Sequence, residues 1–229
     1  MRRFAIYFAP PRAHPLWQAG CALLGRDPET GEALRQPPLA GIDPARFAAI
    51  TADARRYGWH ATLKPPFALA DGATEEELRG AVAHFARSRP PFPMPPLRLA
   101  CLSGFLAVVP ERPAPALDDL AAAAVRALDP FRRPATPEEL LRRRAAGLDA
   151  IEERNLERWG YPYVMERFRF HMTLTARLED AEREAVAASV APHLAPALAV
   201  PLVADAVAVY VEPAPGAPFR LSERFAFGG

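Results

Sequence analysis

Two histidines, His60 and His171, occupy the same place in two copies of one short pattern. Residues 56–63 read RYGWHATL and residues 167–174 read RFRFHMTL, so both match as Arg, aromatic, any, aromatic, His, any, Thr, Leu. One His-x-Thr-Leu string means little, but chance gives on the order of 0.01 copies in a chain of this composition. The pair therefore indicates a duplication whose polar positions are kept for chemistry.

The spacing within each copy places its polar residues together. Side chains alternate along a β-strand, so His60 and Thr62 would share one face about 7 Å apart, as would His171 and Thr173. The intervening apolar residues then face a core. If the two strands converge, the site contains two imidazoles and two hydroxyls.

This set of groups suits cleavage of a phosphodiester. The reaction needs a base for the attacking oxygen and an acid for the departing oxygen, and two histidines with pKa values near about 6.5 can hold opposite protonation states. Threonine hydroxyls can hydrogen-bond the non-bridging oxygens. The motif offers His-x-Thr instead of His-x-His, and no nearby carboxylate completes a ligand set. We therefore expect neither a metal nor a cofactor.

Three further residues are candidates for substrate binding. Tyr7 lies on a first strand opposite its apolar neighbours and could line the cleft, although an edge-strand tyrosine fits equally well. Lys64 shares the face of His60 and Thr62 by period two, and Arg169 shares that of His171. Both could neutralise a phosphate or simply face solvent.

For the other arginines and histidines, the pattern favours roles in the fold over roles in chemistry. Arg56 and Arg167 match in the two copies, which favours a structural role in both halves, with contact to a phosphate as the alternative. The run from Arg142 to Arg144 is typical of a solvated helix face, with a lid over an anionic substrate as the alternative. The remaining histidines, which lack a partner pattern, are His14, His84 and His193.

Composition limits the class of protein. In 229 residues, 28 Lys and Arg oppose 27 Asp and Glu, and this near-neutral balance argues against a protein that grips long nucleic acid. Cys21 and Cys101 lack the spacing of a zinc site or a disulfide framework. The first apolar run is short and ends at two prolines, and no stretch reaches the roughly 18 residues of a membrane span. We expect a cytoplasmic monomer that binds a small anionic phosphodiester and no membrane.

The pattern around the motifs predicts an α+β protein with one bilobal domain over residues 1–229. Each repeat, at about 56–110 and 167–212, is predicted as a motif strand, a helix and two paired strands, with each helix covering its own sheet. The two lobes would be related by a pseudo-twofold axis and line a central cleft. Helices over 111–160 would connect them, including 116–128 and one from Thr136 to Trp159. Asp43 caps a helix over 45–56, and residues 25–42 form a surface loop.

The paired motifs resemble those of the two-histidine (2H) phosphoesterase superfamily. The strings RYGWHATLKPPF and FRFHMTLT, with YFAPP near the start and VEPAPGAPF near the end, resemble most closely a branch encoded in bacterial phosphonate-utilisation operons. The resemblance covers essentially the whole chain. It implies a bilobal fold, catalytic roles for His60, Thr62, His171 and Thr173, and a cyclic ribose phosphate from phosphonate breakdown as substrate.

Two alternatives stay open. One is an RNA phosphodiesterase acting on 2′,3′-cyclic or 2′-5′ linkages, which would need a basic groove leading away from the cleft. The other is a module that binds a phosphate ligand without turnover.

Overall fold

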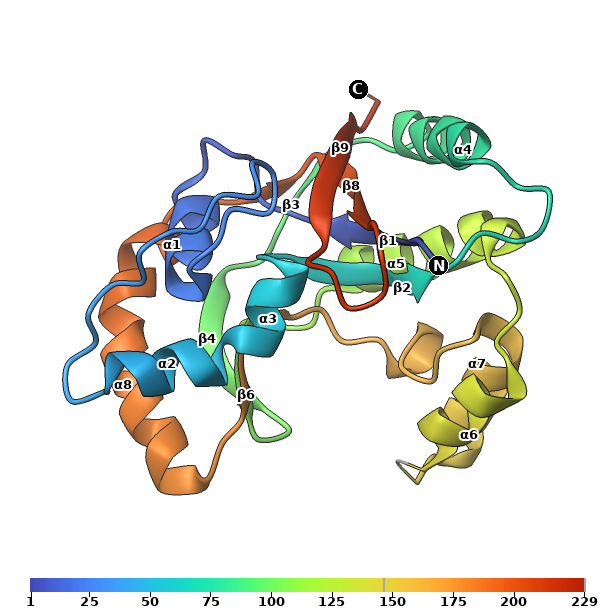
Figure 1. Ribbon diagram of the computed structural model, residues 1–229. Coiled ribbons are helices and arrows are strands. Elements are labelled where there is room, and N and C mark those ends of the chain that lie inside the picture. Colours follow the sequence, from blue (N-terminus) through green and yellow to red (C-terminus); the bar gives the residue numbers. More distant parts are fainter. Residues whose placement is uncertain (146, 229) are drawn as a thin grey trace.

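The two motif strands lie side by side in the middle of one antiparallel sheet in the computed structural model, which describes residues 1–145 and 147–228 (Figure 1). The seven-stranded sheet has the order β4-β5-β6-β2-β1-β8-β9. Its strands are β1 (Arg3–Phe8), β2 (Ala61–Phe67), β4 (Leu97–Leu102), β5 (Phe105–Pro110), β6 (Met172–Arg177), β8 (Ala206–Glu212) and β9 (Arg220–Ala226). A separate two-stranded sheet joins β3 (Phe92–Pro93) to β7 (Val203–Ala204).

The α+β class is confirmed, but the prediction that each repeat forms its own sheet is wrong. Strand β5 of the first repeat pairs with β6 of the second, and β8 of the second repeat pairs with β1, which in turn pairs with β2. The β4–β5 hairpin is confirmed, whereas the predicted pairing of the two strands after the second helix is wrong because β7 pairs with β3. Pairing across the repeats buries strand edges that two small sheets would expose.

The helices of the two repeats also pack against strands outside their own repeat. The first-repeat helix α4 (Glu75–Arg87) contacts β8 and β9, and the second-repeat helix α8 (Asp180–Leu198) contacts β4 and β5. The expectation that each helix covers its own sheet is therefore wrong. The other helices are α1 (Pro15–Leu24), α2 (Pro44–Ile50), α3 (Ala52–Tyr57), α5 (Pro115–Leu128), α6 (Pro137–Arg144) and α7 (Ala150–Trp159), with short 3-10 turns η1 (Asp129–Phe131) and η2 (Met165–Arg167).

Local signals account for the helix boundaries. Asp43 accepts a hydrogen bond from the Arg46 amide and begins α2 as predicted. The predicted helix from Thr136 to Trp159 is instead two helices, because Gly147 has a positive φ of 75° and Asp149 forms a new capping box; residue 146 lies outside the described residues. No helix in residues 1–145 or 147–228 has the length and apolarity required to cross a bilayer.

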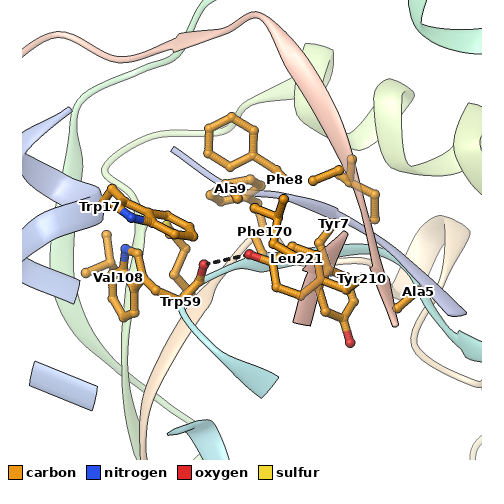
Figure 2. Close-up of a cluster of buried hydrophobic side chains, with 14 of the residues drawn as sticks. Ala5, Tyr7, Phe8, Ala9, Trp17, Trp59, Val108, Phe170, Tyr210 and Leu221 are labelled. Carbon is orange, nitrogen blue, oxygen red and sulfur yellow. Dashed lines mark hydrogen bonds between the residues drawn. The ribbon is translucent and has the colours of Figure 1, made fainter. Parts of the chain in front are cut away.

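A buried aromatic cluster fixes the residue just before the first motif histidine (Figure 2). Trp59 is completely buried, and the Tyr210 hydroxyl lies 3.4 Å from the Trp59 carbonyl oxygen, to which it donates. Gly20 on α1 leaves room for the indole, because a Cβ atom at that position would lie 2.2 Å from the Trp59 ring. Helix α1, which the sequence patterns did not predict, thus positions the start of β2.

A β-bulge corrects the prediction for Lys64. Tyr7 pairs with Thr62 while Ile6 pairs with Lys64, so β2 advances two residues where β1 advances one. Alternation therefore reverses after Leu63, and Lys64 points toward α5 instead of toward the motif face. Its ammonium lies 3.2 Å from the Asp129 carboxylate and is almost completely buried, so Lys64 is not a substrate-binding residue.

The buried ion pair predicts an unequal response to removal of its two members. Burial lowers the pKa of Lys64 to about 8, and the Asp129 charge opposes this shift. We expect Asp129→Ala to lower the free energy of unfolding by roughly 2–4 kcal/mol, because it leaves a buried ammonium without its counterion. The measurement is denaturant unfolding at pH 7.

Lys64→Met is the matched control. It replaces the charge with an apolar chain of similar length and leaves Asp129 bound to Arg132, 2.8 Å away. Its stability should stay within about 1 kcal/mol of the parent protein. A larger loss in Lys64→Met than in Asp129→Ala would contradict this account.

Candidate active site

His60 is held by its own backbone immediately before β2. Its Nδ1 atom lies 2.8 Å from the carbonyl oxygen of Gly58. A carbonyl only accepts, so Nδ1 carries the proton and donates it, which leaves the Nε2 lone pair free in the neutral ring. Nε2 lies 3.2 Å from the Thr62 hydroxyl, its motif partner.

His171 repeats this arrangement immediately before β6. Its Nδ1 atom lies 2.7 Å from the carbonyl oxygen of Arg169, again two residues earlier in the chain. The same reasoning assigns the Nδ1–H tautomer to the neutral ring. Both histidines thus have Nε2 as the atom that can exchange a proton with a bound molecule.

The strand register brings the two motifs together. Ala61 of β2 pairs with Met172 of β6 in an antiparallel ladder. In such a ladder the residue before one partner lies across from the residue after the other. His60 therefore falls across from Thr173, and Thr62 across from His171.

Some of the predicted site residues line a cavity of about 500 Å³ beside β2 and β6, and others do not. Thr62, His171 and Arg169 line it. His60 is not in the lining but lies within hydrogen-bond distance of Thr62. Thr173 is partly exposed on β6 and is likewise not in the lining.

Burial controls the protonation of both histidines. It lowers the pKa of His60 to about 4, against the hydrogen bond to Gly58, and a positive charge on His171 lowers it further. Burial also lowers the pKa of His171, against the hydrogen bond to the Arg169 carbonyl. Both rings are therefore neutral at pH 7 in the free protein, and the first proton added on acidification goes to His171.

Tyr7 contacts a histidine instead of the cavity. Its ring stacks on His60 with centroids 3.7 Å apart and planes 19° apart, and only 1% of its surface is exposed. Burial raises the pKa of the Tyr7 phenol well above its ordinary value, so this group is neutral. Tyr7 therefore fixes the orientation of the His60 ring, a role that the alternation pattern did not specify.

The matched arginines of the two motifs both bind carboxylates. Arg56 pairs with the fully buried Glu212, and Arg167 pairs with Asp149. These contacts agree with the structural role favoured from the repeat. Of the arginine run on α6, Arg143 lies over the Tyr161 ring at 4.8 Å.

Sequence reasoning missed several residues that line the cavity. Arg177 lies on β6 at period two from His171 and Thr173, so the alternation that suggested Arg169 could have found it. Neither Arg169 nor Arg177 makes an ion pair within the described residues, which leaves two guanidinium groups available to an anion. The aromatic part of the lining has no comparable pattern and consists of Phe105, Tyr161, Tyr163 and Phe168.

The site contains groups for acid–base chemistry on an anion. Two imidazoles that present Nε2 away from the backbone lie at the starts of adjacent strands, accompanied by threonine hydroxyls and by Arg169 and Arg177. Within residues 1–145 and 147–228, no group of three or more His, Cys, Asp or Glu side chains is placed to bind a metal ion.

Solved structures that are similar to this chain include LigT of E. coli and a phosphoesterase. LigT complexed with NADP+ is 14% identical, with a TM-score of 0.43, and the match covers 100% of this chain and 98% of that one. The phosphoesterase is 15% identical, with a TM-score of 0.43, over 100% of this chain and 99% of that one.

Two curated relatives are both named ribose 1,5-bisphosphate phosphokinase PhnN. The protein of Janthinobacterium sp. (strain Marseille) is 41% identical over 100% of this chain and 51% of its own length. That of Laribacter hongkongensis (strain HLHK9) is 41% identical over 96% of this chain and 50% of its own length. The chain thus spans about half the length of these relatives. A family model described as Protein of unknown function (DUF1045) matches residues 62–220, and the chain belongs to this family.

Proposed function

We propose that this chain is a metal-independent phosphodiesterase that hydrolyses a small cyclic phosphodiester. The observation that carries the proposal is the duplicated geometry of the histidines. Each imidazole donates Nδ1–H to the carbonyl two residues before it, and the two rings flank the same strand pair. Two Nε2 atoms near one phosphorus can serve as base and acid.

The electrostatics support assigning His60 as the base and His171 as the acid. Burial lowers the pKa of both rings, to about 4 for His60, and a positive charge on His171 lowers the His60 pKa further. His60 Nε2 then takes a proton from water as the water oxygen forms a bond to phosphorus. The ester bond to the sugar oxygen breaks, and His171 Nε2 donates its proton to that oxygen. The products are a phosphomonoester and a free hydroxyl group.

The neighbouring side chains suit the phosphate oxygens. The Thr62 and Thr173 hydroxyls can donate hydrogen bonds to non-bridging oxygens, whose charge changes during the reaction. Arg169 is exposed at the cavity and can bind an oxygen pair through its planar guanidinium group. Tyr7 keeps the His60 ring in place by stacking.

A ribose-based cyclic phosphate is the substrate that we favour. The motif strings resemble a branch encoded in phosphonate-utilisation operons, and the name of the two relatives contains a ribose phosphate. The same name raises phosphoryl transfer as a second candidate function. However, this chain has no G-x-x-x-x-G-K-[ST] string, and its only lysine, Lys64, is buried against Asp129. We therefore place the proposed activity in hydrolysis.

Replacement of either histidine should abolish most turnover. We expect His60→Ala and His171→Ala each to lower kcat by about 10²–10⁴-fold, because each removes one proton-transfer group. The assay follows hydrolysis of ribose cyclic phosphates and 2′,3′-cyclic nucleotides in the presence of EDTA, with circular dichroism to confirm folding. The exposed His193→Ala is the matched control and should retain parent activity.

The outcomes separate the alternatives. Full activity in both site variants would eliminate the two-histidine mechanism. Preference for oligoribonucleotides, with kcat/KM falling steeply as salt rises, would favour the RNA phosphodiesterase. Saturable binding of a cyclic phosphate without product would favour the non-catalytic module, and transfer of phosphate from ATP would favour the kinase.

The lowered pKa values predict an acidic pH optimum for kcat/KM. The base must be deprotonated, so the rate should fall as pH drops through the His60 pKa of about 4. The acid must be protonated, so the rate should also fall as pH rises through the His171 pKa, which is lowered from 6.5. The result is a bell with its maximum below pH 6.5.

The kcat profile provides an internal comparison. Bound phosphate carries negative charge, which raises the pKa of both histidines in the complex. The kcat bell should therefore lie at higher pH than the kcat/KM bell. A kcat/KM that continues to rise up to pH 8 would contradict the proposed protonation states.

A further inference from the structure

A second cavity of about 350 Å³ lies between α5, α7 and η2, and it shares no lining residue with the cavity beside the histidines. Arg126 at the end of α5 lines it, together with Arg154 and Arg158 from successive turns of α7. Three exposed arginines from two helices therefore line one hollow.

These arginines are not neutralised by the protein. None of the three makes an ion pair within the described residues, and the one carboxylate in the lining is Glu166. Other arginines of this region do pair, such as Arg144 with Glu153. Like charges gathered without counterions repel each other, and an anion in the cavity would relieve that repulsion.

Hydrogen bonds and an aromatic contact hold the residues that line this cavity in place. Asn155 is buried and donates hydrogen bonds to the carbonyl oxygens of Pro162 and Val164, at 3.3 and 2.9 Å, which fixes the segment after α7. Met165, in the lining, has a positive φ of 52°, a conformation that costs energy for a residue other than glycine. The Arg158 guanidinium lies over the Trp159 ring, 4.8 Å from its centroid, and this contact holds the charge beside the cavity.

We propose that this cavity binds a small phosphorylated ligand with at least two negative charges, at a site separate from the histidine pair. Guanidinium groups match phosphate oxygens in charge and in bidentate geometry. Three of them with a net local excess of positive charge suit a diphosphate better than a single carboxylate. The cavity volume falls within the range of small-molecule sites.

The test is calorimetric titration of the intact chain with inorganic pyrophosphate. We expect a saturable binding event whose Kd weakens by about tenfold or more in Arg126→Gln/Arg158→Gln. The charge-matched control is Arg98→Gln/Arg112→Gln, which removes two exposed arginines outside both cavities and should leave the Kd unchanged. Arg169→Gln/Arg177→Gln, which alters the other cavity, should also retain the event.

Three results would overturn the proposal. They are no saturation with pyrophosphate up to millimolar concentration, an unchanged Kd in Arg126→Gln/Arg158→Gln, and an equal weakening in the Arg98 and Arg112 control. The site does not depend on hydrolysis, so His60→Ala should bind pyrophosphate at this cavity as the parent does. Loss of turnover with this binding intact would therefore bear on the proposed function alone.

Discussion

The antiparallel pairing of β2 with β6 is the constraint on which the site depends. Four buried residues from adjacent strands cross the sheet at this level, with Val108 paired to Met172, Met172 to Ala61, and Ala61 to Phe8. Each buried residue inside this row packs between the paired residues on either side of it. A shift of the strand register would therefore move apolar side chains out of the core. His60 directly precedes Ala61 and His171 directly precedes Met172, so this packed row fixes the distance between the two histidines.

The position of each ring then follows from one short hydrogen bond. A carbonyl two residues earlier accepts Nδ1–H from each histidine, which selects the tautomer and aims Nε2 away from the backbone. At Gly58 the backbone has a φ of 83°, a region that favours glycine. Burial meanwhile disfavours the charged imidazole and so lowers the pKa of both histidines. Orientation and acidity thus have separate causes in the same few residues.

The repeat and its alternation predicted the class of fold, the hairpin of β4 and β5, and the closeness of the two motifs. They failed where the outcome depends on distant segments. The pairing of strands from different repeats depends on which strand edges become buried in the folded sheet. The residues of short apolar runs such as β5 and β8 do not indicate which strand each will pair with. The bulge that turns Lys64 toward Asp129 arises from pairing with β1, and nothing within β2 itself indicates it. Tyr161 and Tyr163 reach the cavity from the segment that follows α7, and no periodic pattern in that segment indicates where its side chains lie.

These departures from symmetry have a chemical consequence. A perfectly duplicated pair of histidines would have equal pKa values, and neither would be preferred as acid or base. Here the β1 strand places Tyr7 in a close stack on His60, whereas His171 contacts Phe105 with centroids 5.8 Å apart and tilted planes. Burial lowers the pKa of His60 to about 4 and that of His171 in the same direction, and a charge on His171 lowers the His60 pKa further. Under the proposed mechanism, a sheet that contains two copies of one motif would offer two different proton-transfer groups, because the strands that flank the two copies differ.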